Sequence, residues 1–173
     1  MEQLIKSIEQ WASDRNIIKG SKPIDQAMKL FSELGELADN VGKGRDCRDD
    51  IGDVFVVLTI MTAQHGHSID DHLSTCGKGY NLKGTVLELC ENLIVFSNAQ
   101  HLENEDVQEA LSMATCLLES IALQNLCSLK ECVQLAYNDI KDRKGLMHNG
   151  LFIKESDPAY ASVVKSIEEN YGA

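Results

Sequence analysis

The stretch DDIGDVFVVLTIMTAQ, residues 49–64, decides the fold. It opens on charged residues and is apolar on nearly every side after Val54, which predicts a helix that is buried from several directions. Such a helix needs packing partners on most of its faces, so it belongs at the centre of a bundle. The helix is expected to begin near Asp49 and to end at the HGHS segment that follows it.

The flanking sequence predicts further helices and little else. Only Pro23 and Pro158 could break a helix, and 5% of the residues are aromatic. Pro23 suits the first turn of a helix and Asp25 its positive end. Residues 14–22 and 143–157 are predicted loops, and Ser156 with Pro158 should open a terminal helix. We expect an all-α helical bundle that forms a single domain over residues 1–173.

Composition and charge exclude several classes of protein. The formal net charge of −11 leaves no basic surface for nucleic acid or for an anionic membrane. The amphipathic N-terminus does not resemble a signal peptide, and no apolar run approaches the length of a membrane span. The six cysteines form no CxxC pair. They are therefore expected to be free thiols, and the protein is expected to be cytoplasmic.

A weak internal repeat is visible between residues 56–73 and 116–133. Gln64 aligns with Gln124 and Ser68 with Ser128 at one constant shift. The segment of about residues 74–127 would then be either an insertion or a degenerate second copy. Glu88 and Glu91 of that segment lack a matching acidic pair, so one complete acidic site is expected.

Two acidic pairs stand at positions that adjacent helices could bring together. Glu33 and Glu36 are three residues apart, and so are Asp50 and Asp53, which places each pair on one helical face. Converging carboxylates repel one another unless hard cations neutralise them, and Mg²⁺ takes oxygen ligands of this kind. The competing interpretation is that both pairs are solvated charges on helix surfaces.

A family resemblance favours the metal site. The segments QAMKLFSELGELADNVGKG (26–44) and DDIGDVFVVL (49–58) resemble the ExxE, spacer, ExxD signature of MazG-like all-α nucleoside triphosphate pyrophosphohydrolases. Asp50 stands where Glu is usual, and Asp49 is an alternative third ligand. The resemblance extends over about residues 10–72 and 128–155, and its C-terminal part is similar to phage-type relatives and to the phosphate-binding motifs of dimeric dUTPases.

This resemblance implies a fold of the all-α NTP pyrophosphatase type and a specific reaction. Mg²⁺ or Mn²⁺ would be held by Glu33, Glu36, Asp50 and Asp53, and metal-bound water would cleave a (deoxy)nucleoside triphosphate into the monophosphate and pyrophosphate. Glu36 and Glu33 would be the catalytic carboxylates, with Glu36 orienting the water. The candidate substrate-binding residues are Gln26, Lys29, Asn138, Lys141, Arg143 and Lys144.

Several points stay open from the sequence. Cations near a helix end also suit the helix dipole, so Lys141, Arg143 and Lys144 have that second explanation. Asp14, Arg15 and Asn16 are candidates to close over a nucleotide. The resemblance implies a homo-oligomer, either a dimer or a tetramer, and dGTP selectivity is one of its variants. The alternatives are a dUTPase-like enzyme and a non-catalytic acidic helical interaction protein.

Overall fold

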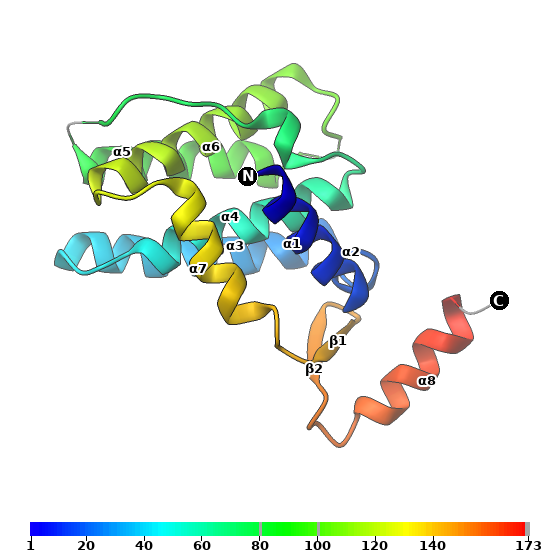
Figure 1. Cartoon of the computed structure of the whole chain (residues 1–173). Coiled ribbons are helices and arrows are strands. Elements are labelled where there is room, and N and C mark those ends of the chain that lie inside the picture. Colours follow the sequence, from blue (N-terminus) through cyan, green and yellow to red (C-terminus); the bar gives the residue numbers. More distant parts are fainter. Residues whose placement is uncertain (80, 100, 172–173) are drawn as a thin grey trace.

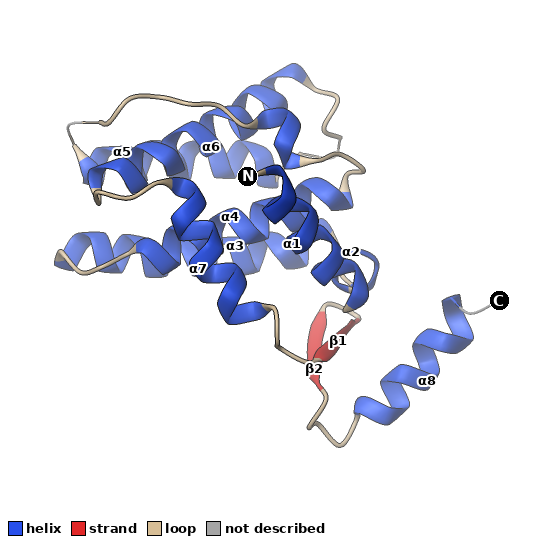
Figure 2. Ribbon diagram, in the orientation of Figure 1, coloured by secondary structure: helices blue, strands red, loops and turns tan. Residues whose placement is uncertain are grey.

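A computed structural model describes residues 1–79, 81–99 and 101–171 as a helical bundle with one small β-hairpin (Figures 1 and 2). The elements follow the chain in this order: α1 (Glu2–Asp14), α2 (Ile17–Gly20), α3 (Pro23–Lys43), α4 (Arg48–Gln64), the 3₁₀-helix η1 (Ile69–His72), α5 (Leu82–Ser97), α6 (Glu105–Gln124), α7 (Leu129–Ile140), β1 (Gly145–His148), β2 (Leu151–Lys154) and α8 (Tyr160–Tyr171). The mostly helical class is as predicted.

Helix α4 is the centre of the bundle, which confirms the prediction made from residues 49–64. It packs against α1, α2, α3, α6 and α7. From Val54 to Thr62 every residue is buried. The two polar residues in this run, Thr59 and Thr62, donate their hydroxyl protons to the carbonyl oxygens of Phe55 and Leu58, at 2.9 and 2.8 Å. No polar side chain of this run therefore interrupts the core.

Helix α3 begins and ends where its sequence indicates. Pro23 occupies the first turn, and the Asp25 carboxylate accepts a hydrogen bond from the backbone N–H of Lys22 at 2.8 Å. Gly44, at φ +65°, ends the helix in the left-handed conformation that glycine adopts without steric cost. Helix α3 packs along α4, so the two acidic helices are neighbours.

The aligned residues of the weak repeat occupy comparable local structures. Gln64 and Gln124 are the last residues of α4 and α6. Ser68 caps η1 and Ser128 caps α7 through their side-chain oxygens. Helices α5 and α6 also pack side by side, as α3 and α4 do. These parallels are compatible with a second copy, and the repeat itself stays a prediction.

The predicted loop over residues 143–157 was wrong in its centre, where β1 and β2 form an antiparallel hairpin with His148 opposite Leu151. Asn149 and Gly150 make the turn with φ values of +51° and +78°, as a two-residue turn of right-handed hairpins requires. The Asn-Gly pair in the sequence is a signal for such a hairpin turn. The predicted loop over residues 14–22 likewise contains the single-turn helix α2.

Two of the six cysteines are not free thiols, which corrects the expectation from the sequence. Cys76 and Cys116 form a disulfide with their Cα atoms 5.3 Å apart. The bond joins the segment before α5 to the middle of α6, 40 residues away. Cys47, Cys90, Cys127 and Cys132 are free. Sequence spacing could not identify this pair, because the two cysteines approach only through the tertiary fold.

Helix α8 begins at Tyr160 and lies apart from the other helices, against the hairpin (Figure 1). Its Val163 is buried there. Within the described residues, no single helix is long and apolar enough to cross a membrane. Helices α6 and α7 are long and apolar enough only when they are taken together, and a bend of 95° separates them.

Gly52 allows α4 and α7 to approach unusually closely. A β-carbon at this position would lie 2.2 Å from the carbonyl oxygen of Cys132 and 2.8 Å from the Cβ of Ala136. Both distances are far below van der Waals contact, and the first partner is backbone, which cannot move aside alone. The crossing of the two helices therefore depends on glycine.

Replacing Gly52 with Ala should force α4 and α7 apart and lower the free energy of unfolding by about 3 kcal/mol. Gly35→Ala is a matched control, since its new β-carbon meets nothing within 4 Å on the exposed side of α3. It should raise stability by about 0.5–1 kcal/mol through helix propensity. Urea unfolding followed by circular dichroism measures both, and equal effects of the two substitutions would contradict the close-packing argument.

Candidate functional site

The acidic residues of α3 and α4 meet at the edge of the bundle core. Glu33 is buried on α3, with 5% of its surface exposed, and Asp50 is buried near the start of α4. Asp53 is half-buried one turn further along α4. The electrostatic influence of Glu33 reaches both Asp50 and Asp53. Glu33 thus lies within electrostatic range of two other predicted metal ligands.

Asp53 has the most perturbed carboxyl of this cluster. Burial raises its pKa from 3.8 to about 7, and repulsion from Glu33 and Asp49 adds to the shift. Lys29 and Arg143 act in the opposite direction. The ionised form of Asp53 is therefore costly unless positive charge is supplied nearby.

Asp49 and Asp50 differ in their surroundings. Asp50 accepts a hydrogen bond from Asn40 Nδ2 at 2.8 Å, which partly offsets the rise in its pKa caused by burial. Asp49 has an exposed side chain, but desolvation of its carboxyl and repulsion from Asp139 raise its pKa. Because Asp49 also acts on Asp53, it belongs to the cluster as much as Asp50 does.

Glu36 stands outside this crowded group. Its side chain is exposed on α3, and the repulsion at Asp53 comes from Glu33 and Asp49. Across residues 1–79, 81–99 and 101–171, no three His, Cys, Asp or Glu side chains are arranged to hold a metal ion. The carboxylates are neighbours, and they would have to draw closer to share one cation.

Two of the predicted substrate-binding cations lie at the acidic cluster. Lys29 forms an ion pair with Glu33 one turn along α3. Arg143 follows α7 and is close enough to lower the pKa values of both Asp49 and Asp53. Residues more than 85 positions apart in the sequence therefore combine negative and positive charge in one place.

The other predicted substrate-binding residues are more dispersed. Gln26 is buried and donates from Nε2 to Ser21 Oγ at 2.9 Å. Asn138 accepts from Lys141 Nζ at 3.2 Å, and both side chains are exposed. Lys144 pairs with Glu155 at 3.6 Å, across the base of the hairpin. Gln26 therefore has a structural partner, whereas the exposed residues remain available to a ligand.

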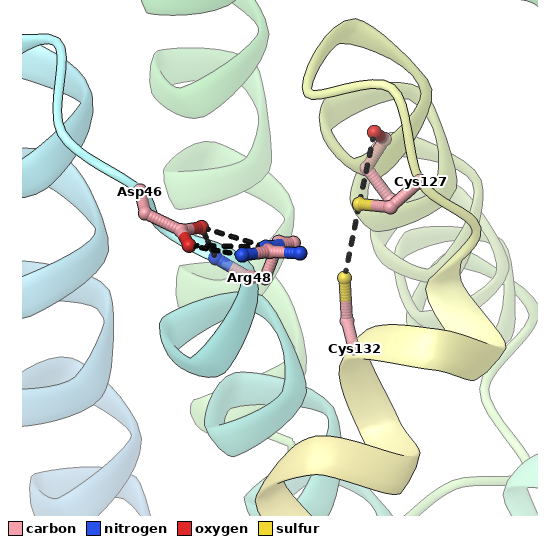
Figure 3. Close-up of polar contacts among 5 residues, drawn as sticks. Asp46, Arg48, Cys127 and Cys132 are labelled. Carbon is pink, nitrogen blue, oxygen red and sulfur yellow. Dashed lines mark hydrogen bonds and ion pairs between the residues drawn. The ribbon is translucent and has the colours of Figure 1, made fainter.

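The N-terminal end of α4 is fixed by a second set of contacts (Figure 3). Arg48 Nε donates to Asp46 Oδ1 at 2.9 Å, and the hydrogen bonds from Arg48 hold the pKa of Asp46 at about 2. Beside this pair, the sulfur atoms of Cys127 and Cys132 lie 3.5 Å apart. Cys47, the N-cap residue of α4, is buried, and burial raises its pKa to about 11. Cys47 therefore packs as a small apolar side chain.

Two contacts at the site were not predicted from the sequence, although Arg15 and Asn16 were candidates to close over a nucleotide. The turn at Arg15 and Asn16 holds the hairpin: Met147 N–H donates to the Arg15 carbonyl at 2.8 Å, and Asn16 Nδ2 donates to the Met147 carbonyl at 2.9 Å. Asn16 has φ +55°, a conformation that Asn tolerates better than most residues. The second feature is Asp139, whose charge acts on Asp49. No local pattern could have indicated either contact, because both join segments distant in sequence.

A cavity of about 360 Å³ lies where this turn, the start of α3, the hairpin turn and α8 meet. Its lining is mainly polar and consists of Asn16, Lys19, Gly20, Ser21, Lys22, Asp25, His148, Asn149, Gly150 and Ile167. Asp25 stands on α3 eight residues before Glu33, which corresponds to about 12 Å along the helix. The cavity is thus on the same helix as the acidic cluster.

Part of the chain is similar to a known phage protein. Over 67 residues the chain is 48% identical to an uncharacterized 18.2 kDa protein in the rep-hol intergenic region of Haemophilus phage HP1 (strain HP1c1). The match covers 38% of this chain and 41% of that protein, so the chain spans about two fifths of the relative's length. No protein-family model and no solved structure matches the chain.

The raised pKa of Asp53 predicts a specific dependence of stability on pH. Between about pH 4 and pH 7 the unfolded chain has already lost this proton while the folded protein still holds it, so this group's contribution to the free energy of unfolding falls as pH rises. Asp53→Asn should remove that fall and make the protein more stable than wild type at pH 8 by about 1 kcal/mol or more.

Urea unfolding at pH 4 and pH 8, without divalent cations, measures the difference. Glu36→Gln removes one negative charge from the exposed side of α3 and serves as the control. It should leave the difference between the two pH values unchanged. An Asp53→Asn protein that loses stability with pH as steeply as wild type would contradict the assignment.

Proposed function

We propose that this protein is a Mg²⁺- or Mn²⁺-dependent hydrolase that converts (deoxy)nucleoside triphosphates to the monophosphate and pyrophosphate. The observation that carries the proposal is Asp53, which is half-buried within electrostatic range of Glu33 and Asp49 and whose pKa is raised to about 7. Crowded carboxylates at the edge of a core are costly to ionise. Side chains with strongly perturbed pKa values of this kind cluster at functional sites. The resemblance to MazG-like enzymes supports the same conclusion.

The donor chemistry fits a hard divalent cation. Glu33 and Asp53, with Asp50 or Asp49 as the third ligand, offer the oxygen atoms that Mg²⁺ and Mn²⁺ prefer, and the exposed Glu36 would have to move toward them to serve as the fourth. A bound cation would supply an acidified water and charge neutralisation at the phosphates. Glu33 must release its ion pair with Lys29 to serve as a ligand, and the long, exposed Lys29 side chain allows that exchange.

The surrounding residues suit a triphosphate. Arg143 offers a planar fork that can hold two phosphate oxygens, and Lys29 offers a mobile point charge. Both already lie at the acidic cluster. We place the nucleoside in the polar cavity that Asp25 lines, since about 12 Å along α3 separates it from Glu33. Asn138, Lys141 and Lys144 would then contact the phosphates from the outer side.

Base preference, assembly and location belong to the same proposal. Selectivity for dGTP, or for dUTP in a dUTPase-like variant, would be set in the polar cavity and not at the acidic cluster. We propose that the chain assembles as a homodimer or homotetramer. We also propose a role in nucleotide-pool control within the cytoplasm of a host cell. The similarity to part of a phage protein supports a phage origin for the chain.

A second candidate function is a non-catalytic acidic interaction protein. The observation that favours it is the outer face of α5, where Leu87, Ile94 and Val95 are exposed alongside the exposed Glu88 and Glu91. An apolar strip bordered by carboxylates is typical of a protein-binding surface. This function would need neither the metal nor the buried position of Glu33.

A panel of canonical and modified NTPs and dNTPs, assayed with Mg²⁺ or Mn²⁺, tests the proposal directly. Wild type should release pyrophosphate and a monophosphate, because the attack falls between the α- and β-phosphates. Glu33→Gln and Asp53→Asn should each lower kcat/KM at least a hundredfold, since each removes an oxygen ligand of the cation. Release of orthophosphate would refute the cleavage position.

The matched control is the double variant Glu88→Gln/Glu91→Gln. It changes an ExxE pair of equal spacing on the exposed side of α5, and its activity should equal wild type. Thermal melting with Mn²⁺ separates the two candidate functions. An enzyme should be stabilised by Mn²⁺ only while Asp53 is intact, whereas an interaction protein should show no shift in either form.

A further inference from the structure

The guanidinium of Arg15 joins the end of α1 to the segment that follows α7. Its Nε donates to the Arg143 carbonyl oxygen at 2.6 Å, and its Nη2 donates to the Lys141 carbonyl oxygen at 3.0 Å. Its Nη1 donates to the Trp11 carbonyl oxygen within α1 at 3.3 Å. The group also lies over the Trp11 ring, 5.0 Å from its centroid. One side chain therefore spans two helix ends.

These contacts fall where the chain has no helix to hold it. Helix α7 ends at Ile140, and the hairpin begins only at Gly145. In the intervening turn the only backbone hydrogen bond donated by Arg143 is to Ile140, at 2.8 Å. Charged donors to carbonyl oxygens make stronger hydrogen bonds than neutral ones. Arg15 thus adds two charged hydrogen bonds to a short connection whose own backbone is held mainly by the N–H groups of Lys141 and Arg143.

This connection carries Arg143, whose charge acts on Asp49 and Asp53. The direction of the Arg143 side chain depends on the position of its own backbone, and Arg15 binds that backbone directly. This role needs the branched guanidinium of arginine, because the two carbonyl oxygens belong to residues two positions apart. A lysine ammonium has no fixed fork with which to satisfy both at once.

We infer that Arg15 is a positioning residue, which holds Arg143 at the acidic cluster so that its guanidinium is ready for the phosphates of the substrate. The inference rests on the proposed function for the identity of the ligand. It concerns a residue outside the acidic signature, in a segment that the sequence predicted as a loop and as a candidate to close over a nucleotide. Arg15 itself need not touch the substrate.

Hydrogen exchange tests the mechanical part of this inference without any catalytic assay. In Arg15→Gln, the amides of residues 141–147 should exchange at least tenfold faster than in wild type, and Arg15→Lys should be intermediate. Lys6→Gln is the control: it also removes one positive charge, but Lys6 lies within α1 and pairs with the exposed Glu2 at 2.5 Å. It should exchange like wild type. Unchanged exchange in Arg15→Gln would overturn the inference.

A binding experiment tests the link to Arg143. Titration calorimetry with Mn²⁺ and a non-hydrolysable α,β-methylene triphosphate analogue should show about tenfold weaker binding in Arg15→Gln and in Arg143→Gln. The double variant should bind no more weakly than Arg143→Gln, because Arg15 acts only through that residue. If the losses of affinity in the two single variants multiply in the double variant, Arg15 does not act through Arg143 and the positioning role is wrong. Arg15→Lys should recover part of the affinity, which a general loss of folding would not predict.

Steady-state kinetics distinguish this inference from the proposed function. If triphosphates are hydrolysed, Arg15→Gln should raise KM about tenfold with little change in kcat, since the lost contact serves ground state and transition state alike. A fall in kcat at constant KM would indicate a loss of folded protein and contradict the inference. If no triphosphate is hydrolysed but the analogue binds as described, the proposed reaction fails while the role of Arg15 stands.

Discussion

The close contact between α4 and α7 at Gly52 is the constraint on which the site depends. A side chain at this position would collide with the backbone of Cys132, so the crossing exists only because residue 52 has none. Asp49 stands three residues before Gly52 on α4 and Asp53 stands directly after it, and the far end of α7 leads to Arg143. The helix crossing that buries the core is therefore the same one that brings the C-terminal cations to the acidic helices.

Much of the bundle could be predicted because its signals are local. The apolar run after Val54 specifies a buried helix whatever surrounds it, and Pro23 with Asp25 specifies where α3 begins. The spacing of Glu33, Asp50 and Asp53 likewise indicated carboxylates on facing strips. Helical periodicity determines which face a residue occupies, and for these residues that face was enough to place them together.

The parts that were missed depend on distant segments. The hairpin at Asn149 and Gly150 did have a local signal, the Asn-Gly pair, although residues 143–157 were predicted only as a loop. No pattern connects Arg15 to Arg143, or Cys76 to Cys116, since each pair meets only after the whole bundle has formed. The exposed position of Glu36 could not be predicted either. Two residues at i and i+3 share one face of a helix, but one of them can lie at the buried edge of that face and the other at its exposed edge.

The charges of Lys29 and Arg143 oppose those of the acidic cluster, and this opposition links ligand binding to the stability of the fold. Burial and mutual repulsion make an ionised Asp53 unfavourable, while Lys29 and Arg143 offset only part of that cost. A divalent cation would offset more of it than either side chain can, and it would release Lys29 from Glu33. The same step that completes a metal site would then free a positive charge for a phosphate group. The fold thus tolerates an unfavourable arrangement of carboxylates that a ligand of the proposed class would relieve.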